Sequence, residues 1–254
     1  MKATEVSYLK FLEGTKQFVV PIYQRTYSWT TKECNQLWKD IVNVSQKDEI
    51  PAHFIGSIVY IEKGIYQVAA VSQLLVIDGQ QRLTTLSLLL SAVADAIEDD
   101  ESIGGMTNSK IKNYYLFNSE ETDDLFFKLR LTRSDKETFW NLLKNNDLPP
   151  QHSFRIQENY QFFADKIAKS KISLEQLIKG LRKLVIVDIS LDRDHDNPQL
   201  IFESLNSTGL DLSQADLIRN YILMGLEPEE QKHLYESYWY IMEQDFGQAN
   251  YTKH

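Results

Sequence analysis

Two β-rich runs followed by a helical period dominate the first part of the chain. Residues 54–61 and 73–77 are rich in Val, Ile, Leu and Tyr, which predicts two strands of a hairpin or small meander. The second run stops at Asp78-Gly79, and from Gln81 to about Ile97 leucines recur at helical spacing. The pattern therefore predicts a strand, a tight turn and a helix start.

Shorter patterns precede these runs. A helical spacing of Val6, Leu9 and Leu12 predicts a helix over 4–12 capped by Thr4. Residues 17–20 read as a strand that runs into Pro21, and the proline places residues 23–29 on a loop. A second amphipathic helix is expected over 31–45.

The rest of the chain is predicted to be mainly helical. Residues 98–108 are acidic and contain glycine, so they are the best candidate for an internal boundary. Beyond them the patterns predict strands at 125–131 and 183–191, and helices at 134–143, 154–169, 174–183, 199–205, from about 213 (with Ser213 to Asp216 as a capping signal), and at 228–244.

These elements predict a mixed α+β fold. The expected organisation is an amino-terminal α+β nucleotide-binding part over 1–100, followed by a mainly helical part over 101–254 whose strand at about 183–191 completes the site.

Composition narrows the classes of function. The net charge of −9, from 36 acidic and 27 basic residues, argues against a whole-surface DNA coat but leaves room for a local basic groove. No apolar run reaches the roughly 18 residues of a membrane span, and the amino terminus lacks the features of a secretory signal. The single cysteine, Cys34, excludes an internal disulfide. We expect a soluble, cytoplasmic protein with no membrane partner.

The turn at residues 78–86 carries the clearest chemistry. A glycine between a strand and a helix leaves backbone N–H groups at the helix start, which favour an anion such as phosphate. Arg82 can add a forked contact to phosphate oxygens, and Thr84 or Thr85 a hydroxyl. Asp78 can hold a metal-bound water, orient Arg82 or contact a ribose. Gln80 and Gln81 can position a water or read a base. The alternative is an ordinary turn with a solvated helix start.

Two further segments leave alternatives open. Gln24, Arg25, Tyr27 and Trp29 follow a proline turn, and they suit either a phosphate or base contact or a structural plug of buried aromatics. Asn206, Gly209 and Asp211 stand at a break between helices, which is a helix junction or a ligand contact.

Other candidates are weaker. The loop with Asp192, Asp194, His195 and Asp196 offers oxygen ligands for a hard metal, although such runs of acids are usually solvated. No Gly-x-x-x-x-Gly-Lys-Ser/Thr loop, Gly-x-Ser-x-Gly elbow or His-Glu-x-x-His helix is present.

Four segments resemble motifs of one family, and they occur in the order in which that family carries them. The segments are Tyr23-Gln24-Arg25-Thr26-Tyr27-Ser28-Trp29, Phe54-Ile55-Gly56-Ser57-Ile58, Asp78-Gly79-Gln80-Gln81-Arg82, and Phe202 to Leu212 continuing into Asp216 to Tyr221. They are similar to motifs of the amino-terminal domain of GmrSD-type modification-dependent restriction endonucleases, within the ParB-like nucleotidase superfamily. The resemblance implies a ParB/sulfiredoxin-like mixed sheet with helices.

The resemblance also implies a function. It points to binding and hydrolysis of a nucleoside triphosphate with Mg²⁺, coupled to a His-Asn-His type nuclease domain or subunit that cuts modified DNA in antiphage defence. It implies Asp78, Gln81 and Arg82 as catalytic residues. The nucleotide-binding set is Gln24, Arg25, Tyr27, Gly79, Gln80, Arg82, Thr84, Thr85 and Asn206.

Two rival functions remain. One is a non-catalytic module that binds a nucleotide or modified DNA as a signal, and the other, ranked last, is a DNA nickase. A homodimer is compatible with either reading.

Overall fold

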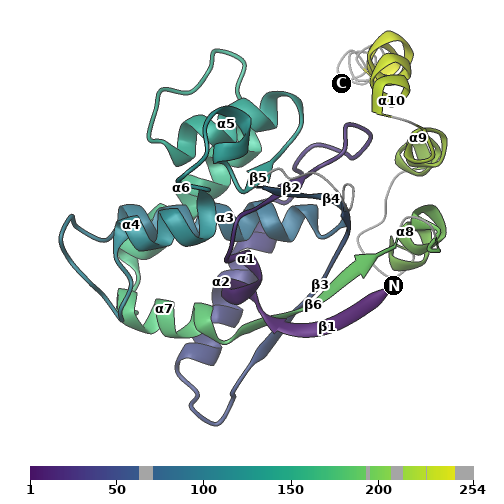
Figure 1. Cartoon of the computed structure of the whole chain (residues 1–254). Coiled ribbons are helices and arrows are strands. Elements are labelled where there is room, and N and C mark those ends of the chain that lie inside the picture. Colours follow the sequence, from purple (N-terminus) through teal and green to yellow (C-terminus); the bar gives the residue numbers. More distant parts are fainter. Residues whose placement is uncertain (63–70, 193–194, 207–213, 227, 244–254) are drawn as a thin grey trace. The chain divides into compact units, whose positions relative to one another are not determined.

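The structure, a computed structural model of the whole chain, describes residues 1–62, 71–192, 195–206, 214–226 and 228–243. Figure 1 labels the helices and strands along the chain, which divides by its internal contacts into two compact units. The first unit comprises residues 1–20 and 26–194, and the second comprises residues 21–25 and 195–254. A short amino-terminal segment therefore belongs, by its contacts, with the carboxyl-terminal part of the chain.

A six-stranded mixed sheet organises the first unit. Its strand order is β1-β6-β3-β4-β2-β5. The β1–β6 and β3–β4 pairs are antiparallel, and the β3–β6, β2–β4 and β2–β5 pairs are parallel. The strands are β1 (Lys2–Ser7), β2 (Lys16–Val19), β3 (His53–Glu62), β4 (Ser72–Asp78), β5 (Leu129–Arg130) and β6 (Leu184–Leu191).

Helices of the first unit pack on this sheet and on each other. They are α1 (Tyr8–Leu12), α2 (Thr31–Ser45), α3 (Gln80–Asp95), α4 (Asn108–Ile111), α5 (Arg133–Leu143), α6 (Phe154–Lys169) and α7 (Leu174–Arg182), with a π-helical turn η1 (Lys112–Leu116) and a 3-10 turn η2 (Asp123–Phe126). Helix α3 packs against α6, α4 and η1, and α2 packs against α7 and α6.

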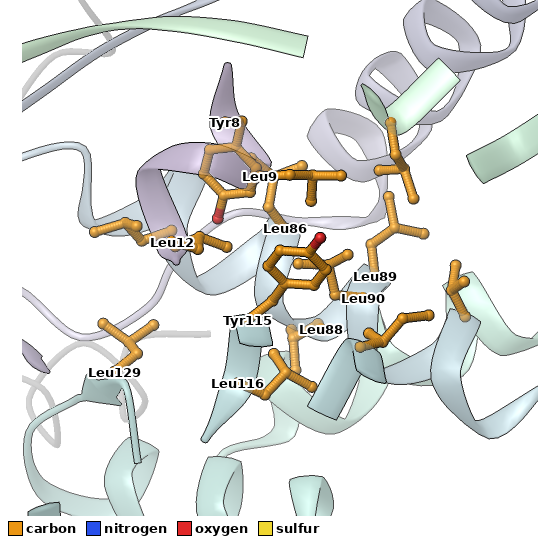
Figure 2. Close-up of a cluster of buried hydrophobic side chains, with 14 of the residues drawn as sticks. Tyr8, Leu9, Leu12, Leu86, Leu88, Leu89, Leu90, Tyr115, Leu116 and Leu129 are labelled. Carbon is orange, nitrogen blue, oxygen red and sulfur yellow. The ribbon is translucent and has the colours of Figure 1, made fainter. Parts of the chain in front are cut away.

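Helix α3 is the centre of the core. Every residue from Leu83 to Ala94 is buried, as expected for a helix that is apolar nearly all round. Figure 2 shows its leucines gathered with Tyr8, Leu9 and Leu12 of α1 and with Tyr115 and Leu116 of η1. A buried helix is a rigid support, so the residues at its start are held firmly relative to the sheet.

The second unit is helical. It contains α8 (Pro198–Asn206), α9 (Gln214–Met224), α10 (Pro228–Leu234) and a π-helical turn η3 (Tyr235–Trp239). Tyr23, from the short amino-terminal segment, is fully buried in this unit beside Leu223 and Tyr235.

The predicted fold class is confirmed: a mixed α+β sheet domain with a mainly helical carboxyl-terminal part. The hairpin is confirmed by the antiparallel β3–β4 pair. Strands β5 and β6 both come from beyond residue 100, so the sheet draws on both sides of the predicted boundary at 98–108. Ser213, predicted to cap a helix, lies outside the described residues.

Two predicted elements were wrong. Residues 4–12 are not one helix, because Lys2–Ser7 pair along their length with β6 and only Tyr8–Leu12 are helical. Residues 125–131 are not one strand either. Residues up to Phe126 form a 3-10 turn and Phe127 bridges Phe117, so only Leu129 and Arg130 pair with β2, which ends at Val19.

Candidate functional site

Strand β4 delivers Asp78 to a tight turn, and α3 begins two residues later. Gly79 makes the turn with φ = 98°, a left-handed conformation that favours glycine. A Cβ at this position would come within 3.0 Å of Ile58 Cγ1 and 3.1 Å of the Ser57 carbonyl oxygen. The turn is therefore pressed against β3 with no room for a side chain.

Arg82 lies in the first turn of α3 and reaches back over β3. Its Nη1 donates to the Ser57 carbonyl and lies 3.5 Å from Asp78 Oδ2. The side chains of Arg82 and Asp78 are 28% and 23% exposed. Both contacts use Nη1, so Nε and Nη2 have no hydrogen-bond partner among the residues that the structure describes. The guanidinium is thus fixed in place, with donors left for an anion.

Gln81 turns away from Arg82 and holds the loop at residues 26–29. Its Oε1 accepts hydrogen bonds from the backbone N–H of Ser28 (2.9 Å) and Trp29 (3.2 Å). Its Nε2 lies 3.5 Å from the Thr26 carbonyl oxygen. The amide oxygen, which we expected to orient a water, is occupied by two backbone donors.

Tyr27, Thr84 and Thr85 are buried behind the turn. Thr84 Oγ1 donates to the Gln80 carbonyl at 2.9 Å, and Thr85 Oγ1 donates to the Gln81 carbonyl at 2.8 Å. The Tyr27 hydroxyl lies 2.7 Å from Thr85 Oγ1 and must be the donor there, because the Thr85 proton is used on the carbonyl. Burial raises the pKa of Tyr27 well above its usual value, so this phenol stays protonated. These hydroxyls support the turn from inside the protein and do not reach its surface.

Two polar residues that the sequence analysis did not single out complete this support. Asn159 of α6 donates to the Tyr27 hydroxyl (2.9 Å) and to the Trp29 carbonyl (2.8 Å). Asp135 Oδ2 accepts from the Tyr27 backbone N–H at 2.7 Å. Both partners lie more than a hundred residues along the chain from Tyr27, and no local pattern marks them.

The remaining predicted nucleotide contacts belong to the other unit. Gln24 is buried in a turn whose backbone N–H donates to the Pro21 carbonyl at 3.1 Å, and Arg25 is half-buried. Asn206 is the last residue of α8, while Gly209 and Asp211 lie outside the described residues. The grouping of Gln24, Arg25 and Asn206 with Arg82 stays a prediction.

Arg219 of α9 is a buried centre that the sequence analysis passed over. It is 4% exposed and donates to the Tyr23 carbonyl (2.5 Å), to Asp216 Oδ1 (2.6 Å) and to Glu243. Two sequence signals mark this pair: the spacing of Asp216 and Arg219 by three residues, and their place in the fourth segment that resembles the family.

The described residues of the acidic loop do not assemble a metal centre. Asp192 and His195 are exposed, and Asp194 lies outside the described residues. Throughout the part of the chain that the structure describes, no three His, Cys, Asp or Glu side chains gather to hold a metal ion. Within that same part, no helix is long and apolar enough to cross a membrane.

The described residues define an α+β domain in which a glycine turn leads from a strand of the sheet into a buried helix with an arginine in its first turn. A family model described as the N-terminal domain of the GmrSD restriction endonuclease matches residues 8–223. The match covers most of the chain, and the chain belongs to this family. A search of curated proteins found no match.

Proposed function

We propose that the chain binds and hydrolyses a nucleoside triphosphate at the turn Asp78–Arg82, as the sensor domain of a modification-dependent DNA restriction system. The observation that carries the proposal is the Arg82 guanidinium, held over β3 through Nη1 with Nε and Nη2 pointing to no described partner. Membership of a restriction endonuclease family supplies the context of a nuclease region that such a sensor would control.

The start of α3 suits a phosphate as well. No side chain caps this helix, because its N-cap is Gly79. The first backbone N–H groups of a helix lack partners within the helix, and they lie at the positive end of its dipole. The backbone N–H groups that follow Gly79 would bind phosphate oxygens, and the fork of Arg82 would add charge-assisted hydrogen bonds.

The carboxylate at the turn suits Mg²⁺ that arrives with the nucleotide. Mg²⁺ is commonly held by one or two carboxylates together with substrate phosphates and waters. Asp78 is the acid at this turn, and it also faces Arg82 at 3.5 Å. Asp78 would hold Mg²⁺ or orient the attacking water, and the metal would supply positive charge that neutralises the phosphates.

Gln81, Thr84, Thr85 and Tyr27 take a different role in this proposal. Their polar atoms bond to one another and to the backbone of the turn and of the loop at 26–29. We assign them as positioning residues, which hold the phosphate-binding backbone in one conformation and do not touch the ligand.

A non-catalytic binding module is the second candidate. The observation that favours it is the engagement of both groups first expected to orient a water: Gln81 Oε1 accepts two backbone N–H groups, and Asp78 faces Arg82. The same pocket would then bind a nucleotide or a modified DNA backbone as a conformational signal.

Phosphate release tests the proposal. ATP, GTP, CTP and UTP are each supplied with Mg²⁺, with modified DNA, unmodified DNA or no DNA. The variants are Arg82→Ala and, as a matched control, Arg155→Ala, which removes an exposed arginine paired with Glu158 on α6. Thermal unfolding confirms that each variant is folded.

Hydrolysis that is lost in Arg82→Ala and kept in Arg155→Ala would support the proposal and name the substrate. Arg82→Lys should bind weakly, because it keeps the charge and loses the fork. Binding without hydrolysis by the wild type favours the second candidate. Unchanged nucleotide affinity in Arg82→Ala would overturn the assigned site.

A further inference from the structure

The segment Pro21–Trp29 is held at its two ends by different units. Residues 21–25 belong to the second unit, and residues 26–29 belong to the first. The two halves are joined directly by the peptide bond between Arg25 and Thr26. We call residues 21–29 the strap.

The first half of the strap is fixed by Arg219. The Arg219 Nε donates to the Tyr23 carbonyl at 2.5 Å, and the Tyr23 side chain is fully buried beside Leu223 and Tyr235. Arg219 is itself held by Asp216 at 2.6 Å and by Glu243. Because breaking a buried ion pair leaves an uncompensated charge, this end of the strap resists movement relative to α9.

Gln81 helps to fix the second half of the strap, together with Asp135 and Asn159. The Gln81 amide accepts from Ser28 and Trp29, while the Tyr27 hydroxyl donates to Thr85 one turn further along α3. Gln81 is the neighbour of Arg82 in the first turn of α3. The loop therefore follows the position of the helix start on which the candidate phosphate-binding residues stand.

Few residues separate the two anchored ends of the strap. Four residues lie between the Tyr23 carbonyl and the Ser28 N–H, and a chain spans at most about 3.6 Å per residue. Backbone N–H groups on both sides of the Arg25–Thr26 bond are held as well, that of Gln24 by the Pro21 carbonyl and that of Tyr27 by Asp135 Oδ2. A shift at residues 26–29 can therefore reach Tyr23 along a short covalent path of four residues.

We propose that the strap couples the start of α3 to the helical second unit, with Gln81 and Arg219 as its two positioning residues. A ligand that moves or rigidifies the Asp78–Arg82 turn changes the stability of α9 through the strap, and the coupling acts equally in both directions. The identity of that ligand rests on the proposed function, but the mechanical coupling does not depend on it.

Hydrogen exchange of the full chain without ligand tests the coupling by itself. Gln81→Ala removes the two bonds to Ser28 and Trp29, and should raise exchange in peptides covering 21–25 and 214–224 by roughly five- to tenfold. The matched control is Gln161→Ala, an exposed glutamine on α6 paired with Asp165, which should leave these peptides unchanged. Gln81→Glu keeps an acceptor oxygen for both N–H groups and should restore most of the protection.

Unchanged exchange in 214–224 in Gln81→Ala would overturn the coupling. A general rise that includes α2 and α6 would also overturn it, because it would mean loss of the fold rather than release of the strap. The reverse experiment uses Arg219→Lys, which should raise exchange at residues 26–29 and at the start of α3.

Hydrogen exchange with a bound nucleotide tests this coupling separately from the proposed function. The triphosphate that binds among ATP, GTP, CTP and UTP, measured by calorimetry, should change exchange at 214–224 in the wild type, and this change should shrink in Gln81→Ala at saturating nucleotide. If no triphosphate binds, the proposed function fails and the ligand-free arm still decides the coupling. If a triphosphate binds but 214–224 does not respond, the coupling fails and the proposed function stands.

Discussion

The guanidinium of Arg82 lies against the backbone of Gly56, so closely that a Cβ on Gly56 would stand 2.8 Å from Arg82 Nε. Gly56 has φ = 111° and occupies an irregularity in the pairing of β3 with β6. The absence of a side chain there is what allows the arginine to cross β3 and reach the Ser57 carbonyl.

Gly56→Ala is therefore expected to damage both stability and the arginine site. The positive φ costs an alanine about 1–2 kcal/mol, and the overlap with Arg82 adds to this cost. We expect a lower free energy of unfolding in urea and at least a tenfold loss of nucleotide affinity. Gly14→Ala is the control, because Gly14 has φ = 82° but its Cβ would meet only Lys16 Cε at 4.0 Å. Equal affinity losses in the two variants would contradict the prediction.

Tyr27→Phe tests the polar support behind the turn. The phenylalanine keeps the ring but removes the hydroxyl that joins Asn159 to Thr85, which leaves the buried Asn159 amide with one fewer acceptor. The free energy of unfolding should fall by about 1–2 kcal/mol. Tyr114→Phe, on a tyrosine that is 52% exposed, should change it little. Chemical denaturation of both variants measures the difference, and a neutral Tyr27→Phe would show that the hydroxyl contributes no net stability.

Gly180→Ala should destabilise the protein although alanine favours a helix. Gly180 lies within α7, where a Cβ would come 2.5 Å from the Ile41 carbonyl oxygen and 2.8 Å from Ile41 Cγ2 of α2. The gain in helix propensity is about 1 kcal/mol, and forcing the two helices apart should outweigh it, for a net loss of about 1–3 kcal/mol. Gly225→Ala, with nothing within 4 Å of its Cβ, provides the comparison by thermal unfolding.

Lys128 should make stability rise with pH. Its Nζ is buried, donates to the Gly14 carbonyl and lies 3.1 Å from Asn118 Oδ1. Burial, with a smaller contribution from Lys16, lowers the pKa of Lys128 to about 8. The unfolded chain, with a lysine pKa of about 10.4, binds more protons between these values, so the free energy of unfolding should increase by about 1 kcal/mol from pH 7 to pH 9.

Lys128→Met should remove most of that rise. The measurement is urea denaturation at several pH values for the wild type and the variant, and the quantity compared is the slope with pH rather than the absolute stability. Parallel slopes would mean that the amine remains charged in the folded protein.

Hydrophobic periodicity and capping residues were enough to predict the helices whose bounds are set by nearby residues. Helices α2 and α6 begin and end where the periodicity placed them, and α2 starts with a capping box between Thr30 and Glu33. Strand β1 escaped prediction because its stability comes from β6, whose paired residues lie about 180 positions away. Val6, Leu9 and Leu12 share a helical spacing, but that spacing carries no information about the distant partner.

In the candidate site, too, the features set by neighbouring residues were predicted and those set by distant residues were not. The turn at Gly79 and the position of Arg82 at the start of α3 followed from the strand-to-helix pattern. The contacts of Gln81 did not, because Ser28 is 53 residues away. Thr84 and Thr85 were expected to face a phosphate. Successive helical positions point about 100° apart, so their hydroxyls turn inward while Arg82 faces the surface.

The placement of β6 between β1 and β3 has a consequence for synthesis on the ribosome. Strand β3 is made long before residues 184–191 emerge, and at about 5–20 residues per second the wait is on the order of ten seconds. During that time β1 has no neighbour and β3 presents one open edge, the kind of edge to which other chains add. The nascent chain therefore depends on late completion of its sheet, and a chaperone that covers β3 until β6 arrives would act on the step most exposed to misassembly.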